Sequence, residues 1–234
     1  MQGDEVVHRY NWSTPIVISP HDPNRLYILG NRVFRSHDEG EHWEPISPDL
    51  TRSDPEKLGG ASGTGENSIV NDYCTISSFS ESPSRHGVLW AGTDDGLVHC
   101  SQDDGLTWRN VTPPDLPAWS TVHVEASPHA AGTVYAAATA HALDDFHPYV
   151  YRSEDFGQTW QPIVNGLPAD DFIRVVRGDP VQPGLLYAGG ESGVYLSLDA
   201  GANWWSLQLN LPHAPVHDLI VAGNDLVIGT HGRG

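Results

Sequence analysis

The sequence is short of positive charge: 12 lysines and arginines stand against 30 aspartates and glutamates in 234 residues, and Lys57 is the single lysine. The formal net charge of −18 produces a field that repels the phosphate backbones of DNA and RNA. No local cluster of basic residues offsets this field. The composition therefore predicts that the protein does not bind nucleic acid.

Long hydrophobic runs are also missing. No stretch approaches the roughly 18 consecutive apolar residues of a membrane-spanning helix, so we expect no membrane span. The start, "MQGDEVVHRY", lacks the basic-then-apolar pattern of a secretory signal. The compartment stays open: the protein is secreted or periplasmic if an export signal has been removed, and otherwise cytoplasmic.

Cysteine is scarce as well. Cys74 and Cys100 are the only two, and each falls in a strand-like segment. Such thiols are most often small buried apolar groups, so we favour free buried thiols, while the sequence leaves their redox state open.

Turn-forming residues, by contrast, are abundant, with 24 glycines and 18 prolines beside eight tryptophans. This composition indicates short strands joined by tight turns. The pattern Ser-x-Asp-x-Gly-x-x-Trp occurs four times, and we call each copy a box. The fixed positions are Ser36, Asp38, Gly40 and Trp43; Ser101, Asp103, Gly105 and Trp108; Ser153, Asp155, Gly157 and Trp160; and Ser197, Asp199, Gly201 and Trp204.

The boxes mark a longer repeat. Their starts lie 65, 52 and 44 residues apart, so the unit is near 44 residues, with insertions at 52–69 and around 140–148. Each unit reads as four short strands separated by turns that contain proline or glycine. Four-stranded units of this length predict an all-β propeller in a single domain. The units cover about 13–51, 70–112, 119–164 and 171–208, with a partial fifth blade at 214–230 and a long loop at 52–69.

Within this fold the box has a structural meaning. The serine ends the third strand, the aspartate accepts hydrogen bonds from the turn, and the glycine supplies a positive φ angle. The tryptophan opens the fourth strand and can pack its ring across the turn. We therefore predict that the four box aspartates stabilise turns and are not catalytic.

The four boxes resemble the Asp-box, or bacterial neuraminidase repeat, of the propellers found in sialidases, xyloglucan hydrolases and sortilin-type receptors. The chain looks closest to bacterial sortilin-like repeat proteins that are often labelled glycosyl hydrolase. Family members are usually longer, which implies that this chain is part of a larger propeller. The segments that carry the resemblance are "RYNWSTPIVISPHDPNRLY", "VFRSHDEGEHWEPISPDLT", "LWAGTDDGLVH" and "VHDLIVAGNDLVIGTHGRG".

The resemblance implies a function only in part. Sialidases carry an arginine triad and a Phe-Arg-Ile-Pro stretch, whereas "DFIRVVRGDP" at 171–180 offers Arg174 and Arg177 without that motif. No counterpart of the xyloglucanase carboxylates is evident either. We therefore favour a non-catalytic propeller that binds a protein, peptide or glycan. A sialidase- or xyloglucanase-like glycoside hydrolase is the alternative.

Strand order predicts where a ligand binds. If box turns join the third and fourth strands, the turns between the second and third strands lie on the opposite face. Polar side chains gather in those turns and along the first strands, and acids or bases there are also ordinary turn formers. The candidate ligand-binding residues are Asp94, Asp95, His123, Glu125, His141, Asp144, Asp145, Arg174, Glu191, His217, His231 and Arg233.

Metal binding has little support in the sequence. Calcium could use Asp94, Asp95, Asp144 and Asp145, but these residues lack any ligand-spacing signature. His141 and His147, without cysteine, are a weak zinc motif. We expect no metal and no cofactor.

The partial fifth blade raises the question of ring closure. Two strands at 214–230 would leave unpaired backbone groups that invite pairing with another strand. The segment 5–12 could latch the ring by pairing beside 225–230. The alternatives are a homodimer that forms through the open blade edges, and missing strands that come from residues outside 1–234.

Overall fold

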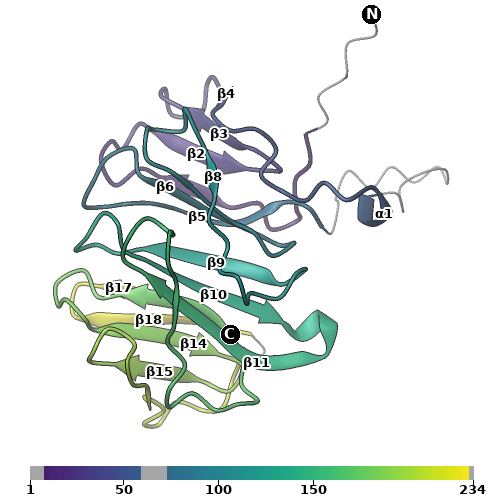
Figure 1. Cartoon of the computed structure of the whole chain (residues 1–234). Coiled ribbons are helices and arrows are strands. Elements are labelled where there is room, and N and C mark those ends of the chain that lie inside the picture. Colours follow the sequence, from purple (N-terminus) through teal and green to yellow (C-terminus); the bar gives the residue numbers. More distant parts are fainter. Residues whose placement is uncertain (1–7, 59–72, 232–234) are drawn as a thin grey trace, which may run out of the picture.

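The computed structural model describes residues 8–58 and 73–231 of the chain (Figure 1). Two short helical turns occur there, α1 (Pro55–Leu58) and η2 (His141–Leu143), and the other regular elements are β-strands. The strands form four four-stranded antiparallel sheets and one two-stranded sheet. This confirms the predicted all-β fold of four complete blades and a partial fifth.

Each complete sheet is a meander whose strands follow the chain order. The first sheet contains β1 (Ile16–Ile18), β2 (Leu26–Leu29), β3 (Val33–Ser36) and β4 (Glu44–Pro45). The second contains β5 (Ile76–Glu81), β6 (Leu89–Thr93), β7 (Val98–Ser101) and β8 (Arg109–Asn110). The third contains β9 (Thr121–Ala126), β10 (Val134–Ala140), β11 (Asp145–Ser153) and β12 (Gln161–Pro162). The fourth contains β13 (Ile173–Gly178), β14 (Leu186–Gly190), β15 (Val194–Ser197) and β16 (Trp205–Ser206), and the fifth contains β17 (Val216–Ala222) and β18 (Asp225–Thr230).

The hydrophobic core lies between the sheets. One cluster joins Trp90 and Val98 of the second sheet to Val122 and Val134 of the third. Similar clusters lie between the other consecutive sheets. The second strands β6 and β10 are buried along their whole length because both of their faces meet a neighbouring sheet. A unit of this kind buries its apolar residues only when a second unit stacks against it.

From the second sheet to the fifth, the first strands of consecutive sheets lie beside one another. Strand β5 contacts β9, β9 contacts β13, and β13 contacts β17. Strands β5, β9, β13 and β17 therefore line the inner side of the arrangement, whereas β1 contacts mainly β2 and has two exposed residues, Ile16 and Ile18. The two-residue fourth strands lie at the outer edge of the arrangement.

The box turns repeat the same hydrogen bonds four times. In the second unit, the Ser101 hydroxyl donates to Asp103 and accepts the Gly105 N–H at 2.9 Å, while Asp103 accepts the Thr107 N–H at 2.8 Å. Gly105 and the preceding Asp104 both have positive φ angles, 88° and 60°. The box aspartates therefore stabilise turns, as the sequence predicts.

The box tryptophans reach further than the sequence predicts. Instead of only covering its own turn, the indole N–H donates to a backbone carbonyl of the preceding sheet. Trp108 donates to Ile46 at 2.9 Å, Trp160 to Val111 at 2.7 Å, and Trp204 to Ile163 at 2.7 Å. Trp43 belongs to the first sheet, and its side chain is 39% exposed.

The described part of the predicted latch, residues 8–12, does not pair with β18. Residues 5–7 lie outside the described part of the chain, but Arg9 lies against the first sheet, where its carbonyl accepts the Asn31 N–H at 2.9 Å. The Arg9 guanidinium forms an ion pair with Asp49 at 2.6 Å. Within the described chain, β18 pairs with β17 alone. These polar contacts with Asn31 and Asp49 hold Arg9 against the first sheet and not beside β18.

Three smaller predictions concern the loop, the cysteines and the membrane. Of the long loop 52–69, residues 52–58 are described and include α1. Cys74 and Cys100 are free and buried, which confirms that prediction, and burial raises the pKa of the Cys100 thiol to about 12. In the described residues no helix has the length and apolar character that crossing a bilayer requires.

The tryptophan contacts give a matched pair of variants. Trp204→Phe leaves the Ile163 carbonyl without its donor in a buried setting, so we expect a loss of about 1–2 kcal/mol in the free energy of unfolding. Trp43→Phe should change it by less than about 0.5 kcal/mol, because within the described residues no sheet precedes that of Trp43 and offers its indole a carbonyl. Urea unfolding of both variants tests this, and equal losses would contradict an inter-sheet role for the indole N–H.

A buried imidazole gives the fold a pH dependence. Burial lowers the pKa of His99 in β7 to about 4, and its Nε2 has no hydrogen-bond partner among the described residues. The folded state therefore keeps His99 neutral, whereas the unfolded chain protonates it near pH 6.5. The contribution to stability is complete above pH 6.5 and is lost as the pH falls toward 4.

We expect His99→Leu to flatten this part of the acid profile. Between pH 7 and 4.5 the wild-type protein should lose on the order of 2 kcal/mol more unfolding free energy than the variant. The control is His213→Leu, which removes an exposed imidazole and should follow the wild-type profile. Parallel profiles for wild type and His99→Leu would disprove the assignment.

Candidate functional site

Three predicted site residues occupy the same position in three units. Each follows the second strand and donates its backbone N–H to the residue just before the first strand of its own sheet. The pairs are Asp94 with Thr75 at 3.0 Å, Glu191 with Phe172 at 3.2 Å, and His231 with Pro215 at 3.1 Å. The turns between second and third strands are therefore equivalent, and they lie on the face opposite the box turns.

Five predicted residues come together on this face, and two of them contact Phe172. Arg174 in β13 forms an ion pair with Glu191 at 2.5 Å, and its guanidinium carbon lies 4.5 Å from the centre of the Phe172 ring. The His141 ring stacks on Phe172 with the ring centres 5.0 Å apart. His217 and His231 of the fifth sheet lie together, with their ring centres 5.2 Å apart. We call His141, Phe172, Arg174, Glu191, His217 and His231 the His–Arg–Glu cluster.

The electrostatics connect the two halves of this cluster. Partial burial lowers the pKa of His217, and the positive charges of Arg174 and His231 lower it further. The carboxylate of Glu191 acts in the opposite direction. His217 is thus close enough to the ion pair to respond to both of its charges, and it is held in the neutral state at neutral pH.

Sequence reasoning missed Phe172. Its side chain is buried, yet it lies under both His141 and Arg174, and Phe146 from the third unit approaches it with ring centres 6.0 Å apart. The sequence feature that points to Phe172 is its position immediately before the first strand β13, two residues from Arg174. The side chain of Phe146 is half exposed and extends the aromatic surface.

Asp94 and Asp95 do not join this cluster. Asp94 accepts the backbone N–H of Thr75 at 2.8 Å and its hydroxyl at 2.6 Å, and burial raises the pKa of Asp94. The buried Asp95 accepts the Thr93 hydroxyl and, at 2.7 Å, the Arg52 N–H. Their hydrogen bonds are thus made within the protein, where they stabilise the turn of the second unit.

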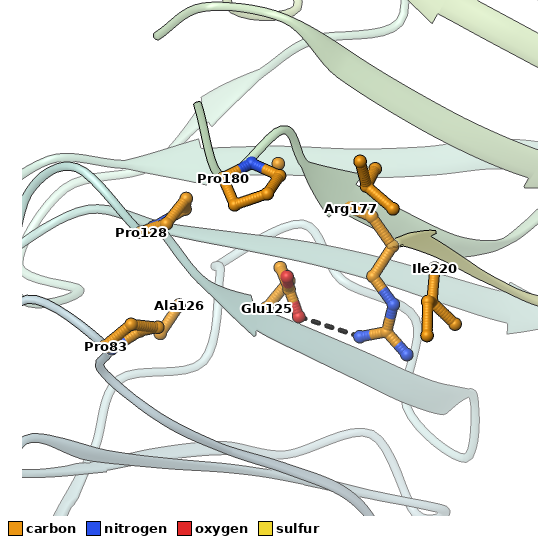
Figure 2. A pocket seen from close by; sticks show the side chains of 9 residues that line it. Pro83, Glu125, Ala126, Pro128, Arg177, Pro180 and Ile220 are labelled. Atoms are coloured by element: carbon orange, nitrogen blue, oxygen red, sulfur yellow. Dashed lines mark hydrogen bonds and ion pairs between the residues drawn. The ribbon is translucent and has the colours of Figure 1, made fainter. Parts of the chain in front are cut away.

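Glu125 lies at the other end of the inner strands, on the side of the box turns. It forms an ion pair with Arg177 at 2.7 Å, and Arg177 also binds Asp218 at 2.8 Å. Burial raises the pKa of Glu125, and the charge of Arg177 counteracts this rise. Figure 2 shows the pair beside Ile220, in a hollow of about 280 Å³ that Pro128 also lines. His123, in the middle of β9, has an Nδ1 atom without a hydrogen-bond partner among the described residues.

The remaining predicted residues lie in the hairpin of the third unit or outside the described chain. Asp144 has a left-handed backbone with a φ angle of 59°. Asp145 binds the His147 ring at 2.7 Å and the Tyr149 hydroxyl at 2.7 Å. Arg233 lies beyond residue 231 and is not described. In the described residues no three His, Cys, Asp or Glu side chains gather to hold a metal, so the calcium and zinc arrangements are not assembled.

Comparisons with known proteins identify the fold. An oligoxyloglucan-reducing end-specific xyloglucanase from Emericella nidulans is 26% identical over 166 residues, which cover 66% of this chain and 18% of that protein. The GH74 xyloglucanase structure from Xanthomonas campestris matches with a TM-score of 0.67 and 15% identity, over 96% of this chain and 34% of that one. The GH74 enzyme from Niastella koreensis matches with a TM-score of 0.63 and 17% identity, over 91% and 33%.

No protein-family model matches the chain. The likenesses to solved structures establish that the protein has the β-propeller fold, and that it resembles part of the GH74 xyloglucanases in fold. The chain spans 18% of the matched curated relative and about one third of the two enzyme structures.

The charge network of the cluster gives a direct test. Because the Glu191 carboxylate raises the pKa of His217, Glu191→Gln should lower that pKa further and leave Arg174 unopposed. An NMR pH titration of the His217 ring proton measures the change. Glu154→Gln, in the box turn of the third unit, is the control and should leave His217 unchanged. An unchanged pKa in the Glu191 variant would show that the two residues do not interact.

Proposed function

We propose that the protein is a non-catalytic propeller that binds an uncharged glycan at the His–Arg–Glu cluster. The observation that carries this proposal is the Arg174–Glu191 ion pair, which lies among exposed rings on the face opposite the box turns. This face is free for a ligand because the box turns on the other side are used to join the sheets.

The charges of the cluster favour a neutral ligand with many hydroxyl groups. Arg174 already has a counter-ion in Glu191, so an anionic ligand would compete with that carboxylate. A sugar hydroxyl can accept from the guanidinium and donate to the carboxylate without separating the pair. Glu191 is 43% exposed, so it remains accessible to such a hydroxyl.

The aromatic side chains favour a flat, partly apolar ligand. His141 and Phe146 are exposed on the same side, and Phe172 supports both of them from below. One face of a pyranose ring presents C–H groups and its edges present hydroxyls. A sugar can therefore cover these rings while it bonds the ion pair.

The surroundings of the carboxylates near the cluster support binding over hydrolysis. Glycoside hydrolysis generally requires two carboxylates about 5–10 Å apart that can act on the substrate. Glu191 is bound to Arg174, and the neighbouring Asp171 is 3% exposed and bonded to the Tyr195 hydroxyl and the Ser192 N–H. Glu125 lies at the other end of the inner strands. This arrangement supports binding over the alternative of a glycoside hydrolase.

The resemblances of the chain guide the choice of ligand. Its Asp-box-like repeats resemble those of sortilin-like binding proteins, and a curated relative is named for its action on xyloglucan oligosaccharides. Xyloglucan oligosaccharides are therefore the first glycans to test. A panel of short peptides is the matching probe for a protein ligand.

Calorimetric titration with xyloglucan oligosaccharides tests the proposal. We expect saturable binding and no release of reducing sugar, and Glu191→Gln should weaken binding roughly tenfold because one charged hydrogen bond is lost. Glu154→Gln should bind as wild type does, and both variants should keep the wild-type melting temperature. Turnover of the oligosaccharide would establish the hydrolase alternative. Binding of peptides without any binding of glycans would overturn the glycan assignment.

A further inference from the structure

The boxes of the second, third and fourth units each dock onto the preceding sheet at one residue. The box tryptophan bonds the carbonyl of that residue, and the box glycine leaves room for its side chain. A Cβ atom on Gly105, Gly157 or Gly201 would come within 2.5–2.9 Å of an atom of the same residue. The docking residues are Ile46, Val111 and Ile163.

Leu207 is the corresponding residue of the fourth sheet. It follows Trp204 by three positions, as Ile46 follows Trp43. Its N–H donates at 2.8 Å to Val194, the first residue of β15, and the three docking residues donate to the matching third-strand valines at 2.8–2.9 Å. Leu207 therefore presents the docking geometry, but the described chain supplies no fifth box to bond its carbonyl.

A groove lies at this position. It has a volume of about 420 Å³ and is bounded by Tyr187 and Leu207 of the fourth unit and by Val221 and Leu226 of the fifth. Leu207, Tyr187 and Leu226 are only partly buried and pack against the apolar cluster between these units. The groove thus continues the hydrophobic core at the place where a box would cover it.

The edge of β18 is open beside this groove. In the complete sheets, the first residue of the second strand pairs with the box serine: Leu26 with Ser36, Leu89 with Ser101, Val134 with Ser153, and Leu186 with Ser197. Leu226 corresponds to Leu186, because Thr230 at the end of β18 pairs with Val216 as Gly190 pairs with Ile173. Among the described strands, only β17 pairs with β18.

We propose that the groove and the open edge of β18 form a binding site for a polypeptide hairpin that carries a fifth box. Its first strand, of the form Val-x-x-Ser, pairs with β18 so that the serine lies opposite Leu226. Its tryptophan then donates to the Leu207 carbonyl. The hairpin comes from outside residues 1–234, because each of the four boxes is already paired within its own sheet.

A synthetic peptide with the sequence of residues 193–208, "GVYLSLDAGANWWSLQ", is the probe. Fluorescence anisotropy of the labelled peptide should show saturable binding to the intact chain. Replacing the peptide tryptophan that corresponds to Trp204 by alanine should weaken binding roughly tenfold or more, because its ring and N–H make the inter-sheet contact. Equal binding of the two peptides, or no binding of either, would overturn the proposal.

Variants of the chain locate the site. Leu207→Arg fills the groove and should abolish binding, and Val181→Glu changes its rim at a residue that is 80% exposed and should weaken binding without loss of folding. Leu209→Arg is the matched control, because Leu209 is 90% exposed and does not line the groove. Binding that none of these variants changes would place the peptide elsewhere and reject the site.

A cross-link tests the register. Val227 corresponds to Tyr187, which pairs with Leu196. A chain with Val227→Cys should therefore form a disulfide with a peptide that carries cysteine at the position of Leu196, and not with one that carries it at the position of Leu198. Cross-linking to both peptides alike, or dimers of the chain that the peptide does not dissociate, would contradict the proposed pairing.

Discussion

The contact between one sheet and the next is the interaction on which the rest of this structure depends. Trp204 shows how it works: its ring joins the core between the third and fourth sheets, and its N–H bonds the carbonyl of Ile163. One side chain thus buries apolar area and fixes the orientation of two sheets. A fourth strand such as β16 has only two ladder pairs with β15, so the tryptophan that precedes it provides much of its attachment.

This use of the box turns leaves the opposite face as the proposed recognition surface. The faces of the fold are not equivalent, because one carries the turns that join the sheets and the other carries turns whose side chains differ from unit to unit. The His–Arg–Glu cluster takes His141 from the third unit, Arg174 and Glu191 from the fourth, and His217 and His231 from the fifth. A site of this kind exists only after three sheets have stacked, so the proposed binding surface depends on the same docking contacts as the core.

The sequence predicts the units well because the box is local: its serine, aspartate and glycine bond one another within five residues. The site is less predictable because its neighbours are distant in the chain. Asp94 and Glu191 occupy the same turn position, but Thr75 donates its backbone N–H and its hydroxyl to Asp94. Phe172 at the matching position has no hydroxyl, and Glu191 pairs with Arg174 instead. The residue before the first strand therefore decides whether the acid at this turn position is held within the turn or is available to a ligand.

The fifth sheet contributes to both proposed binding surfaces, the His–Arg–Glu cluster and the groove beside β18. Strand β17 carries His217, and His231 follows directly after β18, so the paired imidazoles depend on the order of a sheet with only two strands. Two-stranded sheets are marginal, and local opening is easiest where few neighbours are present. Any strand that covers the edge of β18 stabilises the backbone that positions both histidines. By thermodynamic linkage, a ligand that orders those histidines must favour the covered edge to the same extent.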